Sequence, residues 1–402
     1  MVDRPPNVLG NDPRPRFFPV ADAVDLGLIP PPDRHGTAVR VWARSLAGMQ
    51  KGVLVATTLG GPAWRVVSDE GSDLNGYDEG PFPLGHMAVG MLASYTNELL
   101  ALARRRGVEL RDLRLTLDNH YTMEGSALRG TMIGGALPPE LSLECTAELD
   151  ADGLRGLVSD AVHASPVNAL LRQALTSAFT LTVNGERSDP GRVPELTGDC
   201  PPDPVGGFVE ARVAPNDGPQ PLVELLPEPE SEEPGDGGGL TETQNRRLHV
   251  RAVCTIRDDG VKEITAHLRR PAGALFRFLS DEPAGPGRPA RAPDAASYVA
   301  AGIAFCFMTQ FGRYASITKR KLETYRLVQD LHLPVGGASG GTGTAGNAGP
   351  VETHVFLETP HGQEFGRSAL AMSEQTCFLH AVCRTALKTR VRVLAGGEPA
   401  TV

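Results

Sequence analysis

Two long apolar segments stand out in the pattern of hydrophobic and polar positions along this chain. They span residues 84–106, "LGHMAVGMLASYTNELLALARRR", and residues 296–317, "ASYVAAGIAFCFMTQFGRYASI". Each is long enough for about six helical turns. Pro81 and Pro83 suit the start of the first helix, and an arginine run followed by Gly107 suits its end. The pattern therefore predicts one long helix from each segment.

Shorter elements surround the two predicted helices in the same order. Alternating positions predict a strand pair before each helix, with turns near Gly48 and Gly260. After each helix the pattern predicts two strands, a helix–break–helix unit and a closing strand. These segments are 37–57, 110–122, 141–150, 152–175 and 179–185 in the first half, and 249–268, 322–333, 351–360, 366–387 and 388–396 in the second.

The two halves overlay when the chain is shifted by 212 residues, which brings Val41 onto Val253. The same shift brings Gly90 onto Gly302, and it brings "SDEG" at 68–71 onto "SDEP" at 280–283. The same shift aligns the two halves from about residue 41 to residue 165 without a net insertion. Because a constant offset combined with a constant order of elements is hard to obtain by chance, the sequence predicts an internal duplication.

The remaining segments read as irregular chain. Residues 1–36 are Pro-rich, and residues 185–246 are acidic and rich in Pro and Gly, with one short packed piece expected around "PLVELL" at 221–226. A Gly-rich insertion, "GGASGGTGTAGNAG" at 336–349, has no Lys-Ser/Thr ending and is not a phosphate loop. The predicted organisation is an N-terminal segment (1–36), a first domain (37–184), a linker (185–246) and a second domain (247–396).

Composition and charge exclude several classes of function. The formal net charge is -9, which disfavours a nucleic-acid partner. No continuous apolar run of about 18 residues predicts a membrane span, and the N-terminus lacks the apolar core of a signal peptide. We therefore expect a cytoplasmic protein. The six cysteines have no zinc-ligand spacing and form no disulfide framework, so we expect no metal and no cofactor.

The repeat singles out two of the six cysteines. Cys306 corresponds to Ser94, and Cys377 corresponds to Ser165. The interval is 71 residues in both halves (306 to 377 and 94 to 165), with two cysteines in the second half and two serines in the first. The pair is therefore the natural candidate for thiol chemistry.

The doubled pattern resembles the OsmC/Ohr family of osmotically inducible and organic hydroperoxide resistance proteins. The resemblance rests on the long apolar helix carrying one cysteine, a second cysteine about 70 residues later, "SDEP" before "GPG", and "ASPVNALL" at 164–171, which looks like the family's "CPV" context with Ser165 in place of cysteine. It covers about 36–184 and 246–395. "TCFLHAVC" keeps Cys377 but lacks the proline, and the family's usual glutamate just before the helix is absent, with Asp294 nearby.

This resemblance implies an α+β fold of two OsmC-like α/β sandwich domains that form an intramolecular pseudo-dimer. It also implies a thiol-dependent peroxidase with one live site between the domains. Cys306 would attack the peroxide and Cys377 would resolve the sulfenic acid to a disulfide. A hydroxyl cannot perform either step, so the first half would be catalytically silent. The expected partners are a small apolar organic substrate and a dithiol or lipoyl-type reductant, with the chain acting as a monomer.

A buried thiol needs a cationic partner to ionise. Arg257 in "TIRDDG" is the first candidate, because the family places an arginine in a similar hairpin. Arg44 and Arg313 are further candidates, the latter seven residues from Cys306 and so two turns along the same helical face. Glu282 is the candidate for orienting the arginine. His380, three residues after Cys377, is a candidate acid or base.

Two other functions stay open from the sequence. The scaffold could use Cys306 on a specialised metabolite, since the first site, the glutamate and the proline have all changed. The chain could also be a non-catalytic protein that binds a ligand between its domains.

Overall fold

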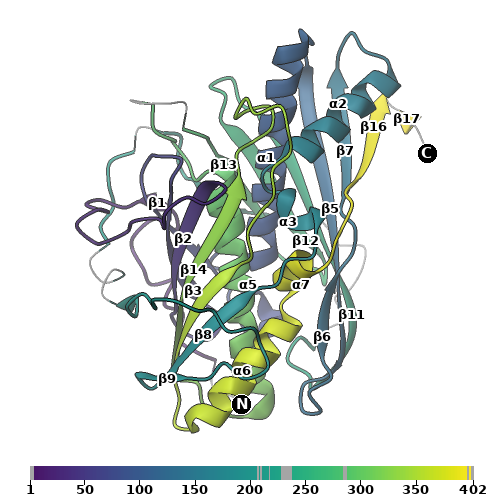
Figure 1. Ribbon diagram of the computed structural model, residues 1–402. Coiled ribbons are helices and arrows are strands. Elements are labelled where there is room, and N and C mark those ends of the chain that lie inside the picture. The colour runs from purple at the N-terminus through teal and green to yellow at the C-terminus, as the bar shows by residue number, and fades with distance from the viewer. Residues whose placement is uncertain are drawn as a thin grey trace.

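The computed structural model describes residues 4–205, 208, 211–216, 218–227, 238–283, 288–395 and 398–399. These residues form a mixed α+β fold in which two β-sheets enclose a pair of long central helices (Figure 1). The helices are η1 (Ser72–Leu74), α1 (Pro83–Arg106), α2 (Ala151–Ala164), α3 (Ala169–Arg172), α5 (Ala295–Thr318), α6 (Gly362–Thr376) and α7 (Phe378–Arg384).

The strands fall into two sheets of matching order within the described residues. The first sheet runs β1 (Phe18–Pro19), β4 (Trp64–Ser68), β3 (Lys51–Thr57), β2 (Gly36–Ser45), β14 (Thr324–Pro334), β15 (Glu352–Glu358), β8 (Ala178–Val183), β9 (Glu186–Ser188). The second runs β10 (Val223–Leu226), β13 (Leu275–Ser280), β12 (Lys262–Arg270), β11 (Thr243–Ile256), β5 (Arg111–Ser126), β7 (Glu140–Thr146), β16 (Arg390–Ala395), β17 (Glu398–Pro399), and β6 (Ile133–Ala136) pairs with β5.

Each sheet combines strands from both halves of the chain. In the first sheet β2 pairs with β14, and in the second β11 pairs with β5, both antiparallel. A bidentate ion pair crosses each of these seams: Arg40 binds Asp330 at 2.7 Å, and Arg251 binds Asp118 at 2.8 and 2.9 Å. The ranges 37–184 and 247–396 are therefore joined through their sheets over long antiparallel registers.

The central helices confirm the prediction made from the apolar segments. Pro83 stands at the first turn of α1, and Gly107 ends it in the left-handed conformation with φ 66°. In α5, Asp294 caps the helix by accepting a 2.7 Å hydrogen bond from Ser297 N. Helix α1 packs on the second sheet, α5 packs on the first, and the two helices pack on each other.

The close approach of α1 and α5 explains the repeated glycines. A Cβ atom at Gly90 would lie 2.5 Å from Val299 Cγ2, and one at Gly302 would lie 2.9 Å from Met87 N. Neither distance is compatible with a side chain, so both positions need glycine for the helices to touch. The repeat places these glycines at one helix–helix contact.

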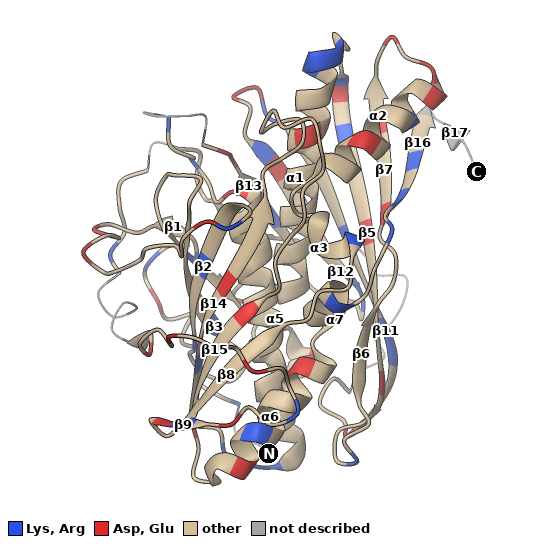
Figure 2. Cartoon of the chain, viewed as in Figure 1, with Lys and Arg blue, Asp and Glu red and all other residues tan. Residues whose placement is uncertain are grey.

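Helix α5 is long and apolar enough to pass a length-and-composition test for a membrane span, but 94% of the tested window is buried inside the protein. Its residues belong to the main hydrophobic cluster. Arg313 is the only Lys, Arg, Asp or Glu in the helix. Figure 2 shows charged residues concentrated on the outer strands, loops and helix ends. We therefore identify α5 as a core helix.

The acidic range 185–246 contains regular structure, both at its ends and inside it. It includes β9, β10 and the first residues of β11. The packed piece expected around "PLVELL" is confirmed as β10, with Leu222 and Val223 buried. Residues 206–207, 209–210, 217 and 228–237 of this range, and 284–287 of the expected loop before α5, lie outside the described residues.

Candidate functional site

Cys306 and Cys377 lie together in the interior. Cys306 sits in the middle of α5, and Cys377 occupies the break between α6 and α7, where its sulfur accepts a 3.5 Å hydrogen bond from His380 N. Both are buried, and all six cysteines are free thiols. The Cys306 side chain is near enough to Cys377 to affect its ionisation. Burial, and next the neighbouring Cys306 side chain, raise the pKa of Cys377 well above its usual value.

The two serines form the matching pair on the other side. Ser94 Oγ and Ser165 Oγ are 2.8 Å apart, and Ser165 Oγ accepts a hydrogen bond from Asn168 N. Ser94 lies in α1, and Ser165 follows α2 as Cys377 follows α6. The two residues thus occupy corresponding breaks, although four residues separate α2 from α3 and Cys377 alone separates α6 from α7.

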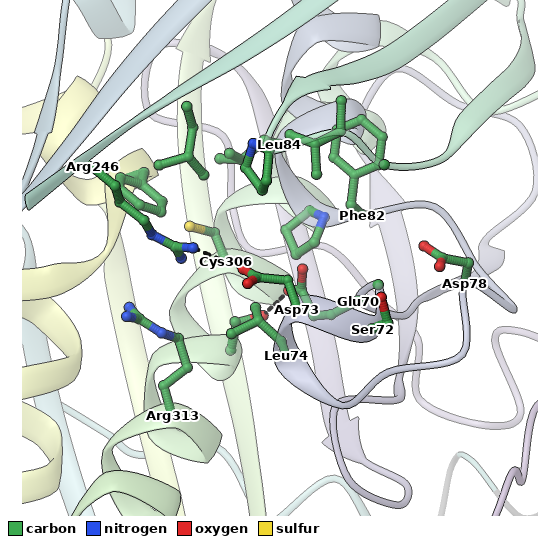
Figure 3. A pocket seen from close by; sticks show the side chains of 18 of the residues that line it. Glu70, Ser72, Asp73, Leu74, Asp78, Phe82, Leu84, Arg246, Cys306 and Arg313 are labelled. Atoms are coloured by element: carbon green, nitrogen blue, oxygen red, sulfur yellow. Dashed lines mark hydrogen bonds and ion pairs between the residues drawn. The ribbon is translucent and has the colours of Figure 1, made fainter. Parts of the chain in front are cut away.

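Cys306 opens onto a cavity of about 210 Å³ (Figure 3). Its walls combine residues of the loop 70–78, the start of α1, the second-sheet residues Arg246, Leu248 and Leu268, and α5. The aromatic ring of Phe378, next to Cys377, also lines it. The thiol is therefore reachable by a compact molecule although its own exposed fraction is only 2%.

A buried glutamate lines the cavity together with Cys306 and has a buried lysine next to it. Glu70 Oε1 accepts a hydrogen bond of 2.5 Å from Thr309 Oγ1 and lies 3.6 Å from Lys51 Nζ. Burial raises the pKa of Glu70 and lowers that of Lys51. The negative charges of Glu70 and, next, Asp69 act in the opposite sense on Lys51 and raise its pKa. The pair can therefore hold or release a proton close to the sulfur.

Two arginines line the same cavity. Arg246 on β11 donates from Nη1 to Asp73 Oδ2 at 2.8 Å, and Arg313 on α5 donates to Gln310 Oε1 at 2.6 Å and to Gly239 O at 2.9 Å. In the view of Figure 3 both guanidinium groups lie on the same side of the cavity as the Cys306 sulfur. Burial, and next the charge of Arg246, lower the pKa of Arg313 to about 10. It remains a cation at neutral pH.

Glu282, the glutamate singled out from the sequence, lies at the serine pair instead. It accepts hydrogen bonds from Asn97 Nδ2 at 2.8 Å and from Ala295 N at 3.1 Å. It lines a second cavity, of about 350 Å³, together with Ser94. Because each sheet combines strands of both halves, the loop that carries Glu282 reaches α1. The corresponding loop, with Glu70, reaches α5.

The three arginines proposed from the sequence lie at different places in the structure. Arg257 lies at the turn between β11 and β12, where Asp259 and Glu263 pair with it at 3.5 and 3.6 Å. Arg44 stacks over Phe208, with its guanidinium carbon 4.8 Å from the ring centroid. Neither lines the cavity at Cys306, whereas Arg313 does.

The remaining candidates are both buried, His380 near the cysteines and Asp294 at the start of α5 near Glu282. His380 contacts the rings of Phe307 and Phe179, and neither of its ring nitrogens has a hydrogen-bond partner. Burial lowers its pKa to about 3, so the ring is neutral. Asp294 caps α5; burial, and next the charge of Glu282, raise its pKa to about 7.

Sequence reasoning missed Glu70, Lys51, Asp73 and Arg246. The repeat carried a signal for Glu70, which is the counterpart of Glu282 at the 212-residue shift. Lys51 has a counterpart only through strand register, because the shift places it on Glu263. Lys51 pairs with Ser68 in its hairpin as Lys262 pairs with Ser280. Arg246 fell within the range expected as linker. Among the described residues, no group of three or more His, Cys, Asp and Glu side chains is arranged to hold a metal ion.

The N-terminal segment supports the wall that carries Glu70. Leu9 N donates to Gln50 Oε1 at 2.9 Å, and Gln50 donates to Asp69. Arg16 forms an ion pair with Glu79 at 2.5 Å. This segment therefore fixes both ends of the loop 69–79 against the first sheet.

Comparison with known proteins adds little to this geometry. No protein-family model matches the chain, and no curated protein matches it. Among solved structures, an OsmC-like hydroperoxide resistance protein from Jannaschia sp. CCS1 is similar over 38% of this chain and 98% of that one, with 18% identity and a TM-score of 0.25. A TM-score of this size is too low to support an inference about fold or function.

Proposed function

We propose that the protein reduces organic hydroperoxides with the thiols of Cys306 and Cys377. The observation that carries the proposal is a pair of buried, neighbouring free thiols, 71 residues apart in the sequence, of which Cys306 opens onto a cavity lined by two arginines. An attacking thiol, a resolving thiol and nearby positive charge are the groups that this reaction requires.

In the proposed cycle the Cys306 thiolate attacks the outer oxygen of the hydroperoxide ROOH. The O–O bond breaks, the sulfur becomes a sulfenic acid, and the alkoxide RO⁻ takes the proton that Cys306 gave up, held meanwhile by the Lys51–Glu70 pair. Cys377 then attacks the sulfenic sulfur, which forms the disulfide and releases water. The high pKa of Cys377 keeps it a thiol until this second step. A dithiol or lipoyl-type reductant supplies two electrons to restore both thiols.

We further propose that the chain is a duplicated OsmC-like unit folded as an intramolecular pseudo-dimer. The matching strand orders, the Ser94–Ser165 and Cys306–Cys377 pairs, and the mirrored bonds of Glu70 and Glu282 support this proposal. In this arrangement the domains 37–184 and 247–396 each lend a hairpin and a glutamate-bearing loop to the other. The first domain would complete the site at Cys306 without chemistry of its own.

Steady-state consumption of cumene hydroperoxide with dihydrolipoamide as reductant tests the proposal. The intact chain should consume peroxide, Cys306→Ser should not, and Cys254→Ser is the matched control because Cys254 is an equally buried cysteine without a thiol partner in the repeat. Equal activity in the intact chain and Cys306→Ser would refute the proposal, as would no consumption by the intact, fully reduced chain.

A further inference from the structure

Arg313 is a buried cation without a matching anion. Its exposed fraction is 2%. Two of its three side-chain nitrogens donate to neutral oxygens, on Gln310 and on Gly239, and the third, Nη2, has no hydrogen-bond partner. Among the described residues no carboxylate lies within ion-pair distance of it. A buried charge of this kind is costly unless something compensates it. The position corresponding to Arg313 in the first half is Ala101, so the cation belongs to the cysteine site alone.

Arg246 supplies a second open donor in the same cavity. Its Nη1 is bound to Asp73, while its buried Nε has no partner. The mutual repulsion of the two guanidinium groups contributes to the lowered pKa of Arg313. Two arginines that line the same small cavity, each with a buried N–H that has no partner, favour an oxyanion beside them.

The acidic residues of the cavity do not fill this role. Asp73 is paired with Arg246. Glu70 is bound to Thr309 and lies beside Lys51, and burial raises its pKa toward the neutral form. In the view of Figure 3, Asp78 lies on the far side of the cavity from both arginines. The Cys306 thiolate can neutralise one charge nearby, but a single sulfur cannot occupy a two-pronged guanidinium as a carboxylate does.

We propose that Arg313 and Arg246 bind the carboxylate of an anionic substrate whose reactive group meets Cys306. This inference rests on the proposed peroxidase function and narrows its substrate to a compact, carboxylate-bearing hydroperoxide. The volume of about 210 Å³ corresponds to about seven water molecules, which suits a short or aromatic acid.

Binding to the Cys306→Ser protein tests the carboxylate subsite without any chemistry. The probes are 4-isopropylbenzoate and its uncharged amide, 4-isopropylbenzamide, titrated by calorimetry. We expect the acid to bind about 30-fold more tightly than the amide, the effect of one desolvated charge pair. Arg313→Met should remove this preference, and Arg104→Met, at the rim of the serine-side cavity, should preserve it. Equal affinities, or no binding of the acid, would overturn the inference even if Arg313→Met does not fold.

A kinetic comparison separates this inference from the proposed function. Cumene hydroperoxide and its para-carboxylate differ only in the acid group. A kcat/KM preference of about tenfold or more for the carboxylate, lost in Arg313→Met, supports the inference. Consumption of both peroxides at equal rates keeps the peroxidase and rejects the carboxylate subsite. Tight binding of the benzoate with no consumption of either peroxide keeps the subsite and rejects the peroxidase.

Discussion

Glu70 of the first half accepts a 2.5 Å hydrogen bond from Thr309 of the second, three residues beyond Cys306. The relationship is mirrored by Glu282 of the second half, which accepts a 2.8 Å hydrogen bond from Asn97 of the first, three residues beyond Ser94. Each half thus supplies the glutamate for the central helix of the other. The strand pairing between halves decides which glutamate reaches the cysteines.

This exchange predicts different effects for two equivalent substitutions. Glu70→Gln should lower kcat/KM for a hydroperoxide by about tenfold or more, the scale of one hydrogen bond at a reacting group. Glu282→Gln should leave it within about twofold, because Glu282 lines the serine-side cavity. Steady-state kinetics on both variants provide the comparison. A larger loss in Glu282→Gln than in Glu70→Gln would contradict this assignment of the two glutamates.

A substitution of Lys51 can be compared with the same substitution of Lys262, the buried lysine of the other hairpin. Lys51→Met removes a fully buried cation next to Glu70 and Cys306, and we expect kcat/KM to fall by about 100-fold. Lys262→Met removes the buried lysine at the same register position of the other hairpin and should change the rate little. The rate of peroxide consumption, with circular dichroism to verify folding, decides the matter. Equal losses in the two variants would point to a structural role for both lysines.

The contact between Ser94 and Ser165 predicts the effect of replacing both serines with cysteine. Because Ser94 Oγ and Ser165 Oγ are 2.8 Å apart, the double variant Ser94→Cys/Ser165→Cys should form a second disulfide with diamide. It should not gain a second rapid reaction with peroxide, since Ala101 replaces Arg313 on that side. Thiol counts after each oxidant measure this. Two additional thiols lost to peroxide as fast as the native pair would show that the surrounding cations are dispensable.

Because the His380 ring is buried and neutral, we expect the free energy of unfolding to fall in acid. Its pKa is about 3 in the folded protein and about 6.5 in an unfolded chain. Below pH 6.5 the unfolded state therefore binds a proton that the folded state does not, and the free energy of unfolding falls as the pH falls. At pH 5 this one group accounts for about 2 kcal/mol.

Urea denaturation at pH 7.5 and pH 5 measures that loss. His380→Phe, which keeps the ring contacts with Phe307 and Phe179, should show a smaller drop between the two pH values than the unaltered chain. An unchanged drop would mean that His380 does not titrate on unfolding in this range.

The sequence was sufficient to predict the central helices, and it proposed Cys306 and Cys377 as a candidate pair. The long apolar segments predict long helices, and Gly90 and Gly302, which the 212-residue shift relates, both lie where α1 and α5 pack too closely for a side chain. Helical periodicity also placed Arg313 on the face of Cys306. These are local relationships, which a sequence records directly.

The rest of the site depends on pairing between distant strands. The pairing of β5 with β11 and of β2 with β14 carries Glu70 to Cys306 and Glu282 to Ser94, and no local pattern encodes that exchange. Arg246 was missed for a similar reason, because its neighbours are polar and its strand begins beside an acidic, Gly-rich stretch. The long-range register of the strands, rather than the type of residue, determines which site each of these side chains reaches.

The most direct test of the central claim is a single turnover of the fully reduced protein with one equivalent of cumene hydroperoxide, followed by peptide mapping of the disulfides. The account predicts loss of two thiols per chain and a disulfide between Cys306 and Cys377, with a stable sulfenic acid at Cys306 in the Cys377→Ser variant. Retention of all six thiols, or a disulfide that involves neither residue, would contradict it.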